Sequence, residues 1–241
     1  MTFSFPVIGR IESCFNEKFG TPRQPGLAAH ARARLVLEPP YNRPEALEGL
    51  EACSHIWVQF VFHANRPGEW SPRVRPPRLG GNRRLGVFAT RSPFRPSPIG
   101  LSVVRLTGIH CQGEDCWLEL AGVDMIDGTP VLDIKPYLPW VDAVPEATHD
   151  FAGEAPPLLP VNFGETAAAQ LAQLAAEDVQ LRQLQELLVE VLQQDPRPAY
   201  QQPNPERTYG MRISGLNVRW HYQVAAGVAT AIDIISIGRA V

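Results

Sequence analysis

The sequence predicts a mainly β protein, with a single-sheet antiparallel β-barrel followed by a small α+β domain. Short strand-like segments separated by turn residues fill residues 1–145, and no helical pattern there is long enough to connect parallel strands. Residues 161–241 combine a helical region with three further strand-like segments. No Gly-x-Gly-x-x-Gly or Gly-x-x-x-x-Gly-Lys sequence follows a predicted strand, which disfavours a doubly wound nucleotide-binding sheet.

The strands of the predicted barrel are short and rich in β-branched and apolar residues. Residues 31–37 alternate between apolar and basic side chains, as expected for a half-buried strand. Residues 55–63 are apolar at nearly every position, which predicts a strand buried on both faces. Residues 44–50 are expected to form one helical turn. The remaining predicted strands are 5–14, 85–89, 102–106, 116–120 and 130–134.

The carboxyl-terminal part begins after a proline- and alanine-rich stretch, residues 144–160, which predicts a linker or a strap laid over the surface. Residues 165–194 are rich in Ala, Leu, Gln and Glu, and Leu171 and Leu174 are out of phase with the apolar positions that follow. We therefore expect two helices or one bent helix, with an apolar stripe that faces the core. This stripe of the helical region consists of Leu181, Leu184, Leu188 and Val191. Three strands are expected after it, at 208–213, 217–224 and 228–235.

Composition places the chain among cytoplasmic globular proteins. It has 241 residues, 44% of them hydrophobic, and a formal net charge of -3, enough for one large core or a core with a smaller domain. No apolar run approaches the roughly 20 residues that cross a bilayer, and the first residues lack the layout of a secretory signal, so we expect no membrane association. The dispersed histidines predict no metal site. Four scattered cysteines, Cys14, Cys53, Cys111 and Cys116, are expected to be free thiols.

An arginine-rich segment, residues 66–95, stands out from this mildly acidic background. It holds eight arginines and one acid, Glu69, and its prolines restrict the backbone. Guanidinium groups form forked hydrogen bonds with phosphate or carboxylate, so such a cluster favours an anionic partner over a merely solvated loop. The arginines are Arg66, Arg73, Arg75, Arg78, Arg83, Arg84, Arg91 and Arg95.

Three sequence blocks, residues 21–26, 76–101 and 127–137, together resemble the TsaA or TrmO family. That family consists of S-adenosyl-L-methionine-dependent tRNA methyltransferases that act on N6 of threonylcarbamoyladenosine (t6A) beside the anticodon. The resemblance covers about residues 5–145, and residues 195–200 (Asp-Pro-Arg-Pro-Ala-Tyr) match the bacterial branch. It implies a barrel methyltransferase domain in residues 1–145, a homodimer, and a tRNA partner bound through its anticodon loop.

The resemblance also implies the residues of the cofactor site. They come from a first loop, from the end of the buried strand, from the arginine-rich segment and from the last barrel loop. In order they are Pro22, Arg23, Gln24, His63, Ala64, Arg91, Leu101, Thr129, Pro130, Val131 and Leu132. A cofactor with a sulfonium, a carboxylate and an adenine needs an anion partner, backbone donors and acceptors, and an apolar slot, and these residue types supply them.

RNA contacts are expected from arginines that the cofactor does not use. We expect Arg75, Arg78, Arg83 and Arg84 to meet phosphates, and Arg197 and Tyr200 to close the site and hold RNA. Trp70, Phe94, Tyr137 or Trp140 could stack on bases, although core packing is as good an interpretation for Trp70 and Phe94.

Methyl transfer to a ureido-substituted amine needs a group that removes a proton, because the nitrogen lone pair is delocalised. Asp133, His63, Asp195 and Tyr200 are candidates by residue type, and Asp133 is preferred because it adjoins the last cofactor loop. The alternative for Asp133 is an ion pair with Lys135 or an arginine. A non-catalytic barrel that binds RNA through the same basic segment is the competing hypothesis for the whole protein.

Overall fold

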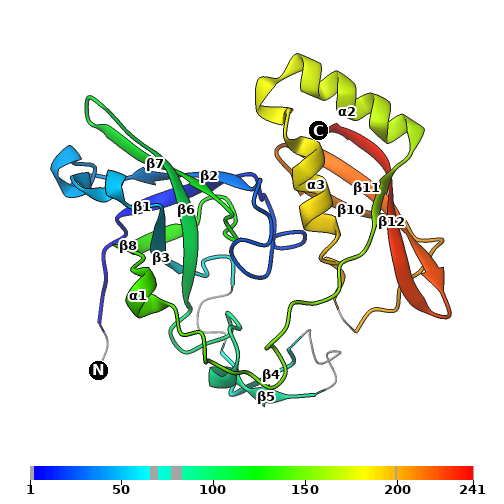
Figure 1. Cartoon of the computed structure of the whole chain (residues 1–241), viewed down its shortest axis with the longest axis horizontal. Coiled ribbons are helices and arrows are strands. Elements are labelled where there is room, and N and C mark those ends of the chain that lie inside the picture. Colours follow the sequence, from blue (N-terminus) through cyan, green and yellow to red (C-terminus); the bar gives the residue numbers. More distant parts are fainter. Residues whose placement is uncertain (1–2, 66–69, 77–82, 199, 241) are drawn as a thin grey trace.

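Six strands of the amino-terminal part close into an antiparallel barrel, in the order β1-β2-β7-β6-β3-β8 (Figure 1). The computed structural model describes residues 3–65, 70–76, 83–198 and 200–240. The single-sheet antiparallel barrel expected from the sequence is confirmed. Its strands are β1 (Gly9–Ser13), β2 (Arg32–Leu37), β3 (His55–Val61), β6 (Ile99–Gln112), β7 (Asp115–Ala121) and β8 (Pro130–Pro136).

The barrel interior is built from alternate residues of each strand. In β3, Ile56, Val58 and Phe60 are buried, and the residues between them are only half-buried. The prediction that this strand is buried on both faces is therefore wrong. In a closed barrel only the inner face lies in the core, and the apolar residues of the other face lie at the outer surface.

A glycine allows β6 to pass close to the aromatic core. A Cβ at Gly100 would lie 2.2 Å from Cζ of Phe60, which faces it across the β3–β6 pair. We expect Gly100→Ala to lower the free energy of unfolding by about 1–3 kcal/mol, because the ring must leave its packed position. Urea denaturation measures the change. Gly86→Ala is the matched control, since its Cβ would meet nothing within 4 Å, and equal stability losses in the two variants would contradict the steric explanation.

Three connections of the barrel leave from the same end. Strands β1, β3 and β7 finish there, and β2, β6 and β8 begin there. The connections are residues 14–31, 62–98 and 122–129. We call this the site end, because every residue that the resemblance assigned to the cofactor lies on one of these connections or on a strand start or end beside them.

Short elements complete the barrel domain. The predicted helical turn is a 3-10 helix at Pro44–Leu47, followed by another at Leu50–Ala52. The strand predicted at residues 85–89 is only partly right: β5 (Leu85–Gly86) pairs with β4 (Arg73–Val74), and Val87–Ala89 turn into a 3-10 helix. The α1 helix (Pro139–Asp142) follows the barrel and carries Asp142, whose carboxylate accepts a hydrogen bond from Nε1 of Trp57 at 2.9 Å.

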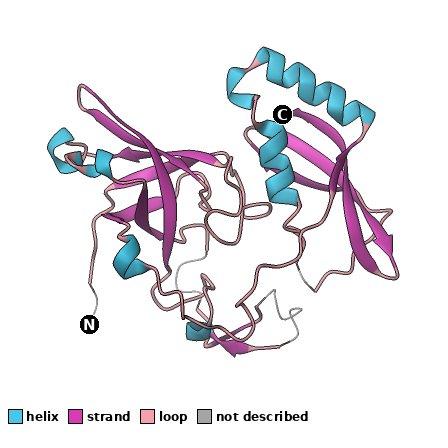
Figure 2. Ribbon diagram, viewed as in Figure 1, coloured by secondary structure: helices cyan, strands magenta, loops and turns pink. Residues whose placement is uncertain are grey.

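The carboxyl-terminal domain is a four-stranded sheet with two main helices, and Figure 2 shows its strands as a sheet separate from the barrel. The helical region divides as predicted, and Leu181, Leu184, Leu188 and Val191 are all buried. A three-residue parallel strand, β9, was not predicted. The elements are β9 (Val161–Phe163), α2 (Glu165–Glu177), α3 (Leu184–Leu192), β10 (Tyr209–Ile213), β11 (Leu216–Ala225) and β12 (Val228–Arg239).

The two domains meet through the first long connection of the barrel. The backbone N–H of Ser214 donates to the carbonyl of Cys14 at 2.8 Å, and the ring of Phe19 stacks on Trp220 with centroids 6.0 Å apart. On the other side of the connection, Nδ1 of His30 lies 2.8 Å from Oε1 of Glu190. The loop that is expected to bind the cofactor, residues 21–26, therefore lies within this junction.

The cysteine prediction is half wrong. Cys111 and Cys116 form a disulfide, whereas Cys14 and Cys53 are free. The pair is directly opposed in the β6–β7 hairpin, with Cα atoms 4.2 Å apart, and this register could not be seen in the spacing alone. Burial raises the pKa of the Cys14 thiol to about 12, so it stays protonated at neutral pH.

Within the described part of the chain, no helix has the length and apolar character needed to cross a membrane. The described residues also contain no group of three or more His, Cys, Asp or Glu side chains arranged to hold a metal ion.

Candidate active site at the junction of barrel and carboxyl-terminal domain

The first loop at the site end, residues 21–26, is fixed to its neighbours by short hydrogen bonds. Thr21 Oγ1 donates to the carbonyl of Glu17 at 2.7 Å, and the N–H of Gly26 donates to the carbonyl of Gly122 at 2.8 Å. Pro22 is buried, whereas Arg23 is exposed. The loop therefore has a fixed backbone, joined to the β7–β8 connection, with Arg23 exposed and Gln24 half-buried.

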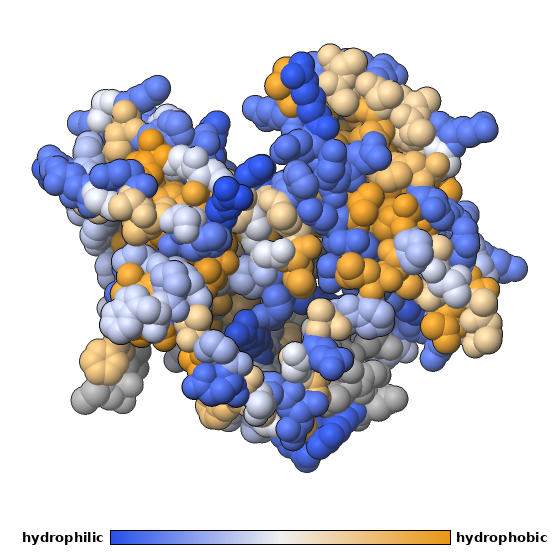
Figure 3. Space-filling model, viewed as in Figure 1, coloured by the Kyte–Doolittle hydropathy of each residue, from blue (hydrophilic) through white to orange (hydrophobic). Residues whose placement is uncertain are grey.

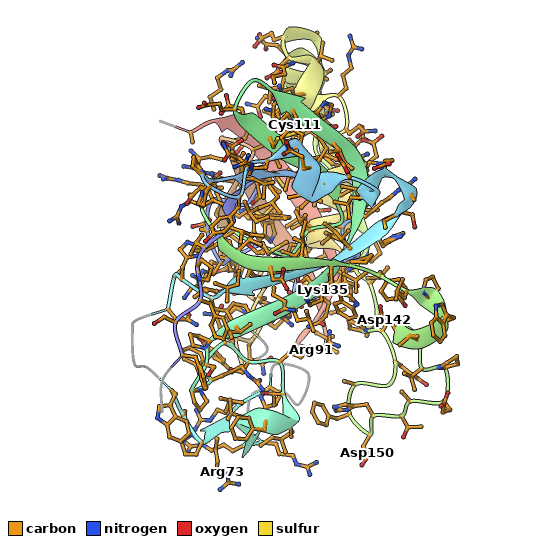
Figure 4. All side chains as sticks on the ribbon, turned by 90° about the vertical axis from the view of Figure 1, so that its left-hand side faces the viewer. Arg73, Arg91, Cys111, Lys135, Asp142 and Asp150 are labelled. Carbon is orange, nitrogen blue, oxygen red and sulfur yellow. A yellow bond between two sulfur atoms is a disulfide. The ribbon has the colours of Figure 1, made fainter. Side chains whose placement is uncertain are left out.

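Arg91 approaches this loop from the arginine-rich segment. Its Nη1 donates to Oε1 of Gln24, so two predicted cofactor residues that are far apart in sequence are in direct contact. Figure 4 shows Arg91 beside the barrel, with Arg73 at the far end of the same segment. Nearby Arg95 has a different role, because its Nη1 donates to the carbonyl of Thr90 at 2.6 Å and so braces the turn that carries Arg91.

The other predicted cofactor residues surround the same end of the barrel. His63 and Ala64 are exposed directly after β3, and Leu101 at the start of β6 keeps 52% of its surface exposed. Thr129 and Val131 are buried at the start of β8, where Pro130 and Leu132 are half-buried. The carbonyl of Thr129 accepts from Ile11, so its backbone is used to close the barrel.

Asp133, the preferred proton acceptor, is the residue of β8 that follows Leu132. Gln59 of β3 pairs with Leu101 on one side and with Asp133 on the other, so Asp133 lies two strand spacings, roughly 10 Å, from Leu101. Its carboxylate pairs with Nζ of Lys135 at 2.8 Å. The structure therefore contains the ion pair that is the alternative role for Asp133, and its catalytic role stays a prediction.

The segment with the sequence Asp-Pro-Arg-Pro-Ala-Tyr supplies the carboxyl-terminal side of the site. The carboxylate of Asp195 accepts hydrogen bonds from Nη2 of Arg197 at 2.7 Å and from the hydroxyl of Tyr222 at 2.9 Å. Partial burial lowers the pKa of Arg197, but the hydrogen bond and the charge of Asp195 outweigh it and raise the pKa overall. Burial, followed by the charge of Asp195, raises the pKa of Tyr222. The three groups form a network that is held together at neutral pH.

This network is connected to the cofactor loop. Nη2 of Arg23 donates to the backbone carbonyl of Arg197 at 3.0 Å, which joins the barrel to the carboxyl-terminal segment. The guanidinium of Arg197 is engaged by Asp195 and by the carbonyl of Gln201. Tyr200, by contrast, is 69% exposed in the same segment. In this arrangement Arg197 braces the segment, and Tyr200 is the side chain available to a ligand.

Several arginines of the arginine-rich segment remain exposed around the site. Arg75, Arg83 and Arg84 are exposed, whereas Arg78 lies outside the described residues. Figure 3 shows the surface hollowed where the barrel, the carboxyl-terminal domain and this segment meet. Exposed Trp70, Phe88 and Phe94 belong to the same segment, so it carries both basic and aromatic side chains at its surface.

Asp124 is a residue of this site that sequence reasoning missed. It lies on the β7–β8 connection between buried Val123 and Met125, and its Oδ1 receives the hydroxyl of Ser102 at 2.7 Å. Burial raises the pKa of Asp124 to about 6, against the effects of the Ser102 hydrogen bond and of the charge of Arg91. The only signal in the sequence is an acid between apolar residues in a loop, which does not distinguish a site residue from an exposed turn.

A closed barrel, an arginine-rich site end and an appended α+β domain define a barrel-type methyltransferase architecture rather than a doubly wound one. The family model for the tRNA-methyltransferase O (TrmO) N-terminal domain matches residues 10–143, and that for the TrmO C-terminal domain matches residues 156–237. The chain belongs to the TrmO family.

Relatives agree with this assignment over nearly the whole chain. The tRNA (adenine(37)-N6)-methyltransferase of Escherichia coli is 48% identical, covering 96% of this chain and 98% of the relative. A putative S-adenosylmethionine-dependent methyltransferase, RcsF, of Pseudomonas aeruginosa is 52% identical, covering 92% and 94%. A crystal structure of TrmO from Pseudomonas aeruginosa, 44% identical, superposes with a TM-score of 0.77 and covers 99% of this chain and 100% of that one.

Proposed function

We propose that this protein transfers a methyl group from S-adenosyl-L-methionine to N6 of t6A at position 37 of tRNA. Membership of the TrmO family supports methylation of adenine 37. The threonylcarbamoyl group of the substrate is the finer part of the proposal and comes from the sequence resemblance. We further propose that the enzyme is cytoplasmic and acts as a homodimer on the anticodon loop.

One observation carries the proposal: segments from four separate parts of the sequence meet at a single end of the barrel. Gln24 holds Arg91 at the surface, and Leu101 offers an exposed apolar side chain close by. A guanidinium, an apolar side chain and a loop backbone fit the carboxylate, the adenine and the polar groups of S-adenosylmethionine. Exposed arginines border the same site, so a cofactor and an RNA can be bound side by side.

The cofactor supplies an activated methyl group when it is bound, so the protein has to position the acceptor nitrogen and remove its proton. Asp195 is occupied by Arg197 and Tyr222, which assigns it to holding the segment rather than to proton removal. His63 and Tyr200 are exposed at the site and stay candidates. Asp133 could take part only after leaving Lys135.

The direct test uses purified protein, labelled S-adenosylmethionine and two tRNA preparations that differ only in t6A. Nucleosides from the digested tRNA are separated and weighed by mass spectrometry. We expect a methyl group on N6 of t6A in the modified tRNA and none in the tRNA without t6A. Methylation of both preparations would contradict the substrate, and RNA binding with no methylation of either would favour the non-catalytic barrel.

The exposed arginines give a separate prediction about RNA affinity. Replacing Arg83 and Arg84 with alanine is expected to lower the slope of log affinity against log salt by about 1.4, since two phosphate contacts are lost. Fluorescence anisotropy with labelled tRNA over a KCl series measures the slope. Arg43→Ala removes one exposed charge from the opposite end of the barrel. If that control lowers the slope as much per charge, the site end does not hold the RNA.

A further inference from the structure

Asp124 is placed to act on a ligand rather than to support the fold. Its carboxylate lies beside the inner face of β6, where Ser102 is 1% exposed and buried Val104 follows two residues later. The loop that carries it is joined to the cofactor loop by the bond between Gly26 and Gly122. Asp124 therefore lies on a loop that runs from Gly122, bonded to the first cofactor loop, to Thr129 at the start of β8, and the family resemblance assigns both that first loop and Thr129 to the cofactor.

The charge of this carboxylate is poorly compensated within the described residues. None of the ion pairs in that part of the protein includes Asp124, and Ser102 is its side-chain hydrogen-bond partner. Acids in such surroundings normally have a cation as partner. The charge that acts on Asp124 is that of Arg91, whose guanidinium contacts Gln24.

Asp124 and Arg91 thus present opposite charges at the same end of the barrel, with Arg91 oriented by Gln24. An α-amino acid group presents the complementary arrangement, an ammonium beside a carboxylate. We propose that Asp124 and Arg91 together bind the α-amino acid group of S-adenosylmethionine, with Asp124 accepting N–H bonds from the ammonium and Arg91 donating to the carboxylate. This inference rests on the proposed function and adds a positioning residue to it.

Two other parts of the cofactor suit Asp124 less well. The sulfonium is cationic but has no N–H to donate to a carboxylate that already accepts a hydroxyl proton. The adenine is uncharged, so it would leave the charge of Asp124 without a partner. Holding the amino acid end at the barrel would also fix the direction in which the methyl group points, because the two ends of the cofactor are then both constrained.

Calorimetric titration of three ligands separates these possibilities. S-adenosylmethionine and S-adenosylhomocysteine both carry the amino acid group, whereas 5′-methylthioadenosine lacks it. We expect Asp124→Asn to weaken the first two by about tenfold or more and to leave 5′-methylthioadenosine within about twofold of the wild type. Arg91→Ala is expected to give the same pattern. Asp115→Asn, which removes an exposed acid at the β6–β7 turn, should change none of the three affinities.

Each other outcome overturns the inference in a defined way. Weaker binding of S-adenosylmethionine alone would assign Asp124 to the sulfonium, and equal weakening of all three ligands would assign it to the fold or to the adenosine. Unchanged affinities in Asp124→Asn would remove the residue from the site. If the wild-type protein bound none of the ligands, the proposed function itself would fail, which the titration distinguishes from a failure of this inference alone.

Discussion

Asp195→Ala is expected to slow methyl transfer by about 100-fold and to lower the free energy of unfolding by about 2–3 kcal/mol. Asp195 is the only group that receives both the guanidinium of Arg197 and the hydroxyl of Tyr222 among the described residues. Without it, Arg197 keeps a charge that is 11% exposed and has no carboxylate partner. The loss is smaller than for a fully buried pair because Asp195 is itself 28% exposed.

The effect on rate follows from where this segment lies. The backbone carbonyl of Arg197 accepts a hydrogen bond from the guanidinium of Arg23. Arg23 adjoins Gln24, whose side-chain oxygen accepts a hydrogen bond from Arg91 and so orients it. If the segment moves, both the cofactor loop and Tyr200 lose their fixed positions. A displacement of about 1 Å in a positioning group is enough for a rate loss of this size.

Two measurements test this prediction. Single-turnover methyl transfer gives the rate, and urea denaturation gives the stability of the same variant. Asp178→Asn is the control, because it removes an acid from the carboxyl-terminal domain at the cap of the 3-10 helix Val179–Leu181, where in the described part of the chain its carboxylate accepts only from the backbone N–H of Gln180. A variant Asp195→Ala with wild-type rate at saturating tRNA would show that the network does not position the site.

The barrel could be predicted from sequence because its signal is local. Alternation in residues 31–37 and the absence of helices long enough for crossovers led to an antiparallel barrel without knowledge of any contact. The same reasoning missed β9 and β4, which have three and two residues, since so few residues show no period. The Cys111–Cys116 disulfide was missed for a related reason, because it depends on the hairpin register.

The site could be predicted only where the family resemblance reached. Gln24 and Arg91 were both proposed, but their contact arises from two loops that leave the barrel at the same end. Sequence alone also could not divide the arginines by role. Arg95 and Arg197 are engaged by carbonyls and by Asp195, whereas Arg83 and Arg84 are exposed, and this difference depends on tertiary structure.

Asp124→Asn is expected to stabilise the free protein at neutral pH, by at most about 3 kcal/mol. Burial raises the pKa of Asp124 from 3.8 to about 6, so the folded state binds this proton more tightly than the unfolded state does. The contribution of the group to stability is therefore fully present below pH 3.8 and is lost as the pH rises through 6. The amide of asparagine does not ionise and can still accept the hydroxyl of Ser102, so the variant avoids the cost of the buried charge.

Urea denaturation of wild type and variant at several pH values tests the sign of this effect. The stability difference should be largest at pH 7.5 to 8 and should shrink toward zero below pH 4, with most of the change between about pH 4 and pH 6. The same ionisation should act on the ligand in the opposite direction, because a protonated Asp124 cannot pair with an ammonium. Wild-type affinity for S-adenosylhomocysteine should fall below pH 6, and the affinity of Asp124→Asn should not follow it.

A stability difference that is constant with pH, or that grows toward acid, would contradict the raised pKa of Asp124. A carboxylate that destabilises the free protein and strengthens ligand binding is what a site residue should show, since its charge is compensated only when the ligand is present.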